Sequence, residues 1–192
     1  MGSTLPAIDD KLTQWIAEQR LFFVATAPLS AQGHVNCSPK GGDTLRVLGP
    51  NDVAYLDGSG SGIETVSHLR ENGRLVIMFC AFDRAPNIVR LHGRGTVIAP
   101  SEARFADLLV KFPPAPTVRS IIHLDVTRVS HSCGYGVPKM DFRVERDDSK
   151  AYLRKSSDKA LRKYLVDNNQ QGVDGLPGMS AEELQRVVIA RE

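Results

Sequence analysis

The stretch TLRVLGPNDVAYL, residues 44–56, decides the fold class that the sequence predicts. Two short runs rich in apolar residues, 44–48 and 52–56, flank the tripeptide Gly49-Pro50-Asn51. Glycine, proline and asparagine are favoured in tight turns, and two such runs around a short turn are typical of a β-hairpin. The stretch therefore predicts two antiparallel strands joined by a turn.

Further short strands and several helices surround this hairpin. The sequence predicts strands at residues 21–27, 34–40, 75–82, 87–98 and 120–132, of which 87–98 is long and bends near Gly93 and Gly95. It predicts helices at 6–20, 61–72, 101–112 and 157–167, and a capping box, Ser180 to Glu183, before a short terminal helix. Many short strands with hairpin turns favour a mainly β, α+β fold built on an antiparallel barrel over a parallel sheet.

The composition is that of an ordinary globular chain. Of 192 residues, 42% are hydrophobic and 24% are charged, and the net charge is +2, so a disordered chain and a polycation that binds nucleic acid are both disfavoured. The longest strongly apolar run, residues 75–82, is far shorter than a membrane span, and the N-terminal residues do not resemble a signal peptide. We therefore expect a single cytoplasmic domain over residues 1–192, with neither membrane nor nucleic acid as a partner.

Cysteines and histidines give no metal or disulfide pattern. Cys37, Cys80 and Cys133 are widely spaced and odd in number, so no disulfide framework is expected. Cys80 lies in an apolar run and is expected in the core. His131 and Cys133 share a strand face, but no second pair with ligand spacing accompanies them, and no metal site is predicted.

The sequence YLDGSGSGIET, residues 55–65, is the strongest indication of a binding site. A strand ends, a Gly/Ser loop follows, and a helix begins, with Ser61 and Glu64 spaced as a capping box. A helix N-terminus exposes unpaired N–H groups and a partial positive charge, and glycines let a ligand approach the backbone. The loop therefore predicts a phosphate site; the alternative from these residues alone is a flexible turn before a capped helix.

Lys40, at the end of a predicted strand, is the cation that we expect beside this loop. A bound phosphate needs a positive charge as well as N–H donors. The alternative is a solvated lysine, with an arginine such as Arg70 or Arg90 in its place. Arg90 lies inside an apolar strand, where an unpaired charge is costly.

Several motifs together resemble the pyridoxamine 5′-phosphate oxidase-like family, in a branch found in bacteria and fungi. They are FFVATA (22–27), VNCSPKG (35–41), VAYLD (53–57) with the loop that follows it, LRENGR (69–74), MFCAF (78–82), RLHG (90–93), SCGYGVP (132–138) and DGLPG (174–178). Each motif alone is weak, but their order and spacing over residues 15–180 make the set specific.

The resemblance implies a split antiparallel β-barrel that forms a homodimer with FMN at the subunit interface. The barrel core would span residues 15–135, with a mixed C-terminal tail, 136–192, packed on it. The residues expected to bind the cofactor are Ser38, Lys40, Ser59, Gly60, Ser61, Thr65 and Arg90. In the loop after the last long strand, Cys133 and Tyr135 are the expected substrate contacts, the alternative being a tight turn with one packed aromatic.

Two departures from the oxidases bear on function. The oxidases carry an Arg-Lys doublet where this chain has Gly58-Ser59-Gly60-Ser61-Gly62, and their Arg-x-His motif is C-terminal, whereas Arg90-Leu91-His92 lies mid-chain. We therefore expect an FMN-dependent oxidoreductase of a small organic substrate other than pyridoxamine phosphate. The alternative is a non-catalytic dimer that binds flavin, the deazaflavin coenzyme F420, or haem. The candidate axial ligands for haem are His34, His68, His92, His123 and His131.

Overall fold

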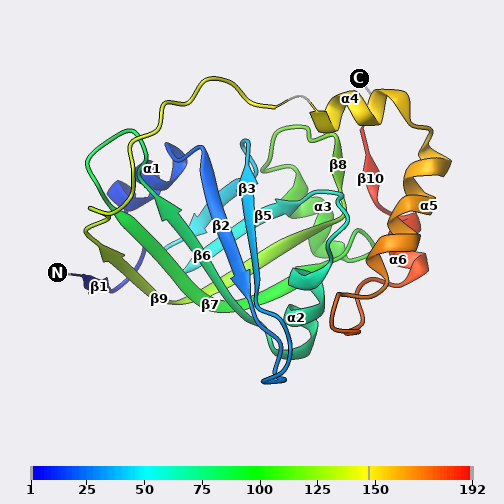
Figure 1. Ribbon diagram of the computed structural model, residues 1–192, viewed down its shortest axis with the longest axis horizontal. Coiled ribbons are helices and arrows are strands. Elements are labelled where there is room, and N and C mark those ends of the chain that lie inside the picture. Colours follow the sequence, from blue (N-terminus) through cyan, green and yellow to red (C-terminus); the bar gives the residue numbers. More distant parts are fainter. Residues whose placement is uncertain (1, 147, 191–192) are drawn as a thin grey trace.

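The computed structural model describes residues 2–146 and 148–190, which form a curled sheet surrounded by helices (Figure 1). The strands of the main sheet are β1 (Ser3–Leu5), β2 (Leu21–Thr26), β3 (Asn36–Gly41), β4 (Leu45–Gly49), β5 (Asp52–Asp57), β6 (Arg74–Cys80), β7 (Ile88–Ile98) and β9 (Ser120–Ser132). A second, two-stranded sheet contains β8 (Thr117–Val118) and β10 (Val188–Ile189). The helices are α1 (Asp10–Ala17), α2 (Glu64–Asn72), α3 (Ala103–Leu109), α4 (Asp148–Lys155), α5 (Asp158–Asn169) and α6 (Ala181–Gln185).

The main sheet is a split antiparallel barrel. Its strand order is β3-β2-β6-β7-β9-β5-β4, with β1 added on β9, and each of these neighbours pairs antiparallel. The two edge strands, β3 and β4, are consecutive in the chain but do not pair, so the barrel is open between them. The predicted fold class is confirmed, and the hairpin predicted at residues 44–56 is the β4–β5 pair.

Alternate side chains of the strands fill the barrel. Along β2 the burial alternates residue by residue, as the period of two in a strand requires. Phe22 and Val24 therefore point inward and are buried. The ring of Phe22 packs against those of Phe79 and Tyr55, with centroids 5.9 Å and 5.6 Å away. The barrel thus has an aromatic centre rather than a hollow one.

The predicted bend in the long strand β7 is confirmed at Gly93. The register between β7 and β9 shifts between His92 and Gly93. A Cβ atom at Gly93 would lie 1.9 Å from the carbonyl oxygen of Asp125, so this bulge accepts only glycine.

Helices α1 and α3 cover the barrel with their apolar faces. Leu12 and Ile16 of α1 are buried in the main core. Phe105 and Leu108 of α3, with Phe112 after it, are buried in a second cluster, whereas Leu109 is only half-buried at its margin. The helix and the turn after it therefore cover the barrel mainly with Phe105, Leu108 and Phe112.

The first two helices are shorter than predicted. The predicted helix at 6–20 begins only at Asp10, since the Asp9 carboxylate accepts a hydrogen bond from Leu12 N at 2.8 Å and acts as N-cap. The predicted capping box of Ser61 and Glu64 is wrong. Helix α2 begins at Glu64, and its N-cap, Ile63, offers no side-chain hydrogen bond. Its predicted end at Gly73, in the left-handed conformation (φ 70°), is confirmed.

The C-terminal helices lie beside the loop that follows β5. Helix α4 was not predicted, whereas α5 covers the predicted helix at 157–167 and buries Leu161 and Leu165. The predicted capping box at the start of α6 is confirmed, with Ser180 and Glu183 each bonded to the other's backbone N–H. Among the described residues, no helix combines the length and apolar character that crossing a membrane requires.

Candidate functional site

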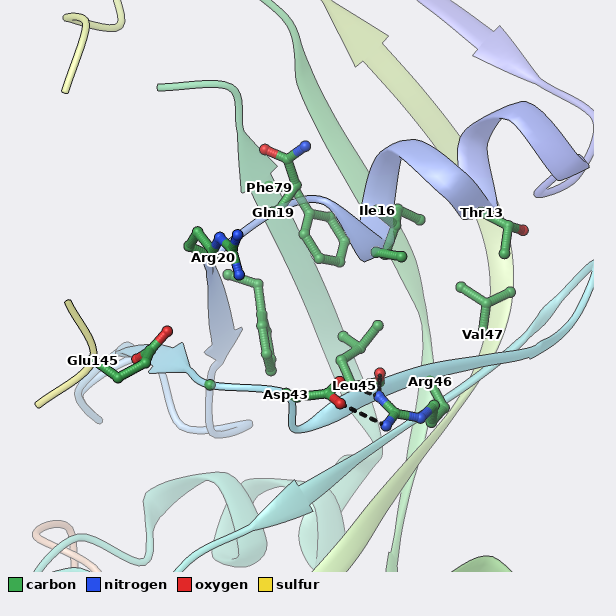
Figure 2. Close-up of a pocket in the computed structure, with 13 residues that line it drawn as sticks. Thr13, Ile16, Gln19, Arg20, Asp43, Leu45, Arg46, Val47, Phe79 and Glu145 are labelled. Carbon is green, nitrogen blue, oxygen red and sulfur yellow. Dashed lines mark hydrogen bonds and ion pairs between the residues drawn. The ribbon is translucent and has the colours of Figure 1, made fainter. Parts of the chain in front are cut away.

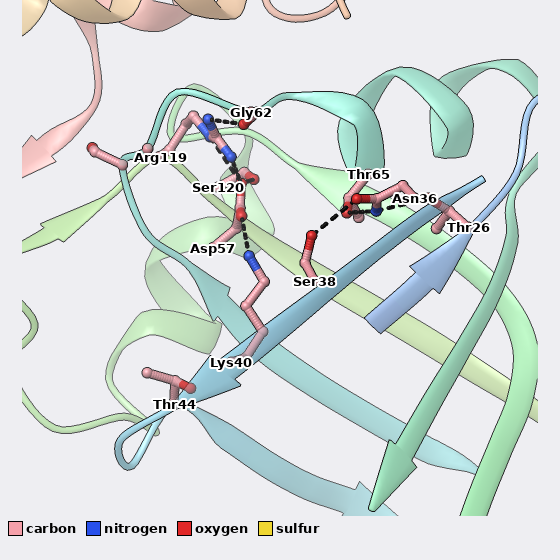
Figure 3. Close-up of polar contacts among 12 residues, drawn as sticks. Thr26, Asn36, Ser38, Lys40, Thr44, Asp57, Gly62, Thr65, Arg119 and Ser120 are labelled. Atoms are coloured by element: carbon pink, nitrogen blue, oxygen red, sulfur yellow. Dashed lines mark hydrogen bonds and ion pairs between the residues drawn. The ribbon is translucent and has the colours of Figure 1, made fainter. Parts of the chain in front are cut away.

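A polar groove lies where β3 and β5 end and the Gly/Ser loop begins (Figure 3). Its volume is about 610 Å³. Its lining includes Ser38, Lys40, Asp57, Ser59, Gly60, Ser61, Glu64, Thr65 and Arg119. The groove spans the opening of the split barrel, because Lys40 lies on the edge strand β3 and Asp57 on β5.

The register of the sheet explains why Lys40 points across this opening. Lys40 pairs with Phe22 of β2, and Phe22 pairs with Phe79 of β6. Directly paired residues share a face of the sheet. Phe22 and Phe79 are buried in the barrel, so Lys40 projects on the inner face, where its Nζ lies 3.7 Å from Asp57 Oδ1.

A buried ion pair, Asp57 with Arg119, forms the base of the groove. Arg119 Nε and Nη2 both lie 2.9 Å from Asp57 Oδ2, which also accepts a 3.1 Å hydrogen bond from the Ser120 hydroxyl. Burial acts to raise the pKa of Asp57. The charges of Arg119 and then Lys40, with the hydrogen bonds, outweigh this effect and hold the pKa below its usual value. Asp57 is therefore an anion at neutral pH.

The loop after β5 is held by its carbonyl oxygens. Asn169 Nδ2 donates to Gly60 O at 2.9 Å, and Arg119 Nη1 donates to Gly62 O at 2.9 Å. Among the described residues, the N–H groups of Gly60, Ser61 and Gly62 have no acceptor. A Cβ atom added at Gly60 would meet nothing within 4 Å. The loop thus offers free donors beside open space.

Two further polar atoms of the groove lack hydrogen-bond partners within the described chain. The buried Oγ of Ser59 makes no hydrogen bond, although the backbone N–H of Ser59 donates to Thr117 Oγ1 at 3.1 Å. The same holds for Asp57 Oδ1, which has only the ion pair with Lys40. Buried polar atoms are normally satisfied, so such atoms mark places where a ligand or water binds.

The start of α2 adds less positive potential than the sequence predicts. Glu64 occupies the first turn, where a carboxylate compensates the partial charge of the helix N-terminus. Glu64 also accepts a 3.3 Å hydrogen bond from Val173 N, and this bond joins α2 to the loop after α5. Donors to an anion must therefore come mainly from the loop before the helix.

A chain of hydrogen bonds continues from the groove into the barrel. The Ser38 hydroxyl donates to Asn36 Oδ1 at 2.9 Å, and Asn36 Nδ2 donates to Thr65 Oγ1 at 3.0 Å and Thr26 Oγ1 at 3.1 Å. The hydroxyl of Thr26 in turn contacts His68 Nδ1 at 2.9 Å. Burial lowers the pKa of His68, so this chain ends in a neutral imidazole. It fixes Ser38 and Thr65 at the groove wall.

Six of the predicted cofactor residues line the groove, and one does not. Ser38, Lys40, Ser59, Gly60, Ser61 and Thr65 lie together there. Arg90 lies on the outer face of the sheet, where its Nη1 donates to Ser132 Oγ at 3.2 Å. Ser132 ends the 13-residue strand β9 that begins at the groove, about 40 Å away along the strand.

The predicted substrate residues also lie outside the groove. Cys133 and Tyr135 follow the far end of β9, and the Tyr135 side chain is 81% exposed. Within one chain the structure therefore does not bring them to Lys40. The predicted burial of Cys80 is confirmed, and Cys37, Cys80 and Cys133 are free thiols.

Most of the histidines proposed as axial ligands are engaged elsewhere. His34 contacts Asp174, His123 contacts Asp52, and His131 contacts the Ser3 hydroxyl. His68 is bonded to Thr26 as described, whereas the Nδ1 atom of His92 is buried without a partner in the described chain. None of the five lines the groove.

The sequence did not identify Asp57, Arg119 or Asn169 as parts of the site. Asp57 and Arg119 are 62 positions apart and meet because β5 pairs with the start of β9. The available signal was a charged residue at the boundary of each of two apolar strands. A pattern within one strand does not reveal which strand will be its neighbour.

Of the further cavities in the described part of the chain, two border the groove or helix α1. One, about 330 Å³, adjoins the groove through Ser59 and Gly60 and is otherwise lined by Thr117, Tyr152, Leu153, Leu161, Tyr164 and Leu165. The other, about 610 Å³, lies between α1 and the β3–β4 turn (Figure 2). Its floor is apolar, and Arg20, Asp43, Arg46 and Glu145 form its rim.

Comparison with known proteins places the chain in a family. Residues 8–133, about two thirds of the sequence, match the family described as Pyridoxamine 5'-phosphate oxidase. The chain belongs to the pyridoxamine 5′-phosphate oxidase family. A member of this family from Aspergillus flavus, ustO, is 38% identical to this chain over 190 residues. The match covers 90% of this chain and 76% of the length of ustO.

Solved structures of the pyridoxamine 5′-phosphate oxidase fold agree with the barrel seen here. A putative pyridoxamine 5′-phosphate oxidase from Lactobacillus delbrueckii has a TM-score of 0.50 and 18% identity, covering 66% of this chain and 97% of its own. A variant of HupZ from Group A Streptococcus has a TM-score of 0.50 and 21% identity to this chain. The match covers 65% of this chain and 99% of the HupZ chain. At these identities the likeness concerns the fold alone.

Proposed function

We propose that this protein is a flavin-binding oxidoreductase that holds the phosphate of FMN in the groove between Lys40 and the 58–62 loop. One observation supports this proposal above the others. The loop that lines the groove carries three backbone N–H groups and a buried Ser59 hydroxyl that lack hydrogen-bond partners in the described chain, and Lys40 lines the same groove. Backbone donors with a nearby cation are what a phosphate monoester requires.

The charges of the groove are compatible with a phosphate. The Asp57 carboxylate is neutralised mainly by Arg119, which approaches it at 2.9 Å through two nitrogen atoms. Lys40 Nζ lies farther away, at 3.7 Å, which is an ion-pair contact but not a hydrogen bond. The ammonium group therefore keeps its donors for a ligand, and the unpaired N–H groups of the loop supplement it.

The body of a flavin is planar and largely apolar, and an apolar cavity adjoins the groove. Ser59 and Gly60 line both spaces, and Tyr164 and Leu165 contribute to the cavity wall. Binding sites that combine a mainly apolar cavity with a few placed polar groups are typical for cofactors. The flavin, when bound, supplies the hydride chemistry, while the chain binds, orients and shields it.

One observation favours a deazaflavin as the second candidate. Glu64 and Asp57 border the groove together with Lys40 and Arg119, so the formal charges of these four side chains cancel. A phosphodiester, as in the deazaflavin coenzyme, carries a single negative charge and needs less compensation than the monoester of FMN, which carries about −1.5 to −2. The two cofactors absorb at different wavelengths, so spectra distinguish them.

Absorbance spectra of the purified protein test the proposal. We expect a yellow protein, or a colourless one whose addition shifts the visible spectrum of FMN, and bleaching of the bound flavin by NAD(P)H. A spectrum with a Soret band, or no perturbation of FMN or deazaflavin at any protein concentration, would contradict it. In Gly60→Val, FMN binding should weaken because the side chain would block the close approach of a ligand to the loop backbone. Thermal unfolding should be nearly unchanged, because a Cβ atom at this position meets nothing within 4 Å.

A further inference from the structure

An exposed segment between β9 and α4 has the pattern of a strand but no partner strand. Residues 139–145, KMDFRVE, which we call the strap, alternate charged and apolar side chains one by one. This alternation is typical of a β-strand with one face covered. The strap nevertheless forms neither helix nor strand, and it passes over the barrel on its way to α4 (Figure 1).

The apolar residues of the strap are largely uncovered. Met140, Phe142 and Val144 are 50%, 49% and 76% exposed. Within the described chain, the strap makes one backbone–backbone hydrogen bond, from Met140 N to Phe82 O at 2.9 Å. The Arg20 guanidinium lies 5.0 Å from the centre of the Phe142 ring, and Arg20 also lines the cavity in Figure 2, so the strap runs along the rim of that cavity. Three exposed apolar side chains within five residues indicate that the strap is a contact surface for another molecule.

We propose that the strap pairs with the strap of a second copy of this chain, antiparallel and centred on Phe142. In this register Phe142 faces Phe142 of the partner subunit, and Met140 faces Val144 of the partner subunit. On the opposite face, Lys139 meets Glu145 of the partner subunit and Asp141 meets Arg143 of the partner subunit. Each contact except the central one occurs twice, as in a closed two-fold interface.

The sequence of charges permits this register and opposes its neighbours. Sliding one strap by two residues places either Asp141 or Arg143 against its own copy, so that like charges face each other. Sliding by one residue sets apolar side chains against charged ones, and a parallel arrangement sets every charge against itself. Like charges directly opposite destabilise a strand pair, and opposite charges stabilise it. Charge complementarity therefore selects a second copy as the occupant and fixes the register.

A pair of seven-residue strands is too small to hold a dimer alone. Stable interfaces bury about 1,200–2,000 Å² in total, and an isolated two-stranded ribbon is marginal in water. The strap pair therefore adds to another contact between the subunits and fixes their relative orientation. It also covers the rim of the cavity in Figure 2, because Glu145 lines that cavity. The proposal does not depend on which cofactor the protein binds.

Cysteine cross-linking tests the register directly. In a background with Cys37 and Cys133 changed to serine, Phe142→Cys should form a covalent dimer under mild oxidation at micromolar concentration. Val144→Cys and Met140→Cys should each stay monomeric on a non-reducing gel, but an equimolar mixture of the two should cross-link. Val110→Cys, equally apolar and 82% exposed on another surface, is the matched control. Cross-linking of Val144→Cys alone, or none at position 142, would overturn the proposal.

Charge reversal supplies a second, independent measurement. Asp141→Arg should weaken dimerisation about tenfold in sedimentation at low salt, because two attractive pairs become repulsive. Adding Arg143→Asp restores the opposite charges and should restore the dimer. Both positions are exposed, so folding is expected to be unaffected. A dimer that is insensitive to Asp141→Arg, a double variant as weak as the single one, or a wild-type monomer at micromolar concentration would each contradict the pairing.

Discussion

At the scale of single residues, the groove depends on how Asp57 is compensated. The carboxylate is 1% exposed and the Arg119 side chain 4% exposed. A buried charge is costly unless a partner neutralises it, and removal of one partner leaves the other uncompensated. The same ion pair that stabilises the strand ends therefore also keeps Lys40 available for a ligand.

Arg119→Met should be strongly destabilising. We expect a loss of about 3–5 kcal/mol in the free energy of unfolding, measured by urea denaturation, because the buried Asp57 would lose its closest partner and keep only the 3.7 Å contact with Lys40 and the Ser120 hydroxyl. Arg186→Met is the matched control. It removes an exposed i,i+4 pair with Glu182 and should cost no more than about 1 kcal/mol. Similar losses in the two variants would contradict the role assigned to the buried pair.

His34 should titrate above its usual range. A hydrogen bond with Asp174, and then the charge of that carboxylate, raise the pKa of His34 from its ordinary value of 6.5. The pair therefore contributes stability that is fully present below pH 6.5 and is lost as the pH rises through the folded pKa. An NMR titration should show the His34 pKa falling toward 6.5 in Asp174→Asn. An unchanged pKa in that variant would exclude the contact.

The site was only partly predictable at this scale. Lys40 and the glycine loop were found because the loop pattern and the need for a cation are local properties of the sequence. Asp57 and Arg119 were missed because their contact depends on which strands become neighbours. The capping box at Ser61 failed for the same kind of reason, since distant Asn169 and Arg119 side chains hold the loop carbonyls and the helix begins later.

At the scale of elements, the sequence pattern predicts the type of each helix or strand more reliably than the residues at which it begins and ends. Apart from the short strands β1 and β8, which were not predicted, the order of helices and strands through β9 agrees with the sequence because hydrophobic periodicity extends over whole elements. The ends shifted by several residues where a cap such as Asp9 stopped a helix. Helix α4 escaped prediction because it is short and largely polar.

Leu108→Ala should test the packing of α3 on β9. Leu108 is 8% exposed and lies in the second hydrophobic cluster. We expect a loss of about 2–5 kcal/mol in the free energy of unfolding. Val110→Ala, just after the same helix but 82% exposed, should cost no more than about 0.5 kcal/mol. A cost below about 0.5 kcal/mol for Leu108→Ala would mean that α3 does not cover the sheet as described.

At the scale of the whole molecule, the split of the barrel creates the site. The edge strand β3 curls back toward the end of β5 without pairing with β4, and Lys40 reaches across the opening to Asp57. The C-terminal helices close the same opening from the other side, where Asn169 of α5 holds the loop. The central claim is therefore that this opening binds the phosphate of a flavin.

Calorimetric titration with FMN and riboflavin tests that claim most directly. Riboflavin lacks the phosphate. Lys40→Ala should therefore weaken the binding of FMN by about 1.5–3 kcal/mol and leave the binding of riboflavin nearly unchanged. Lys163→Ala, whose side chain is 75% exposed on α5, should change neither affinity. Asp57 keeps Arg119 as its partner in Lys40→Ala, so the fold should persist. Equal losses for both ligands, or no loss for either, would contradict a phosphate site at Lys40.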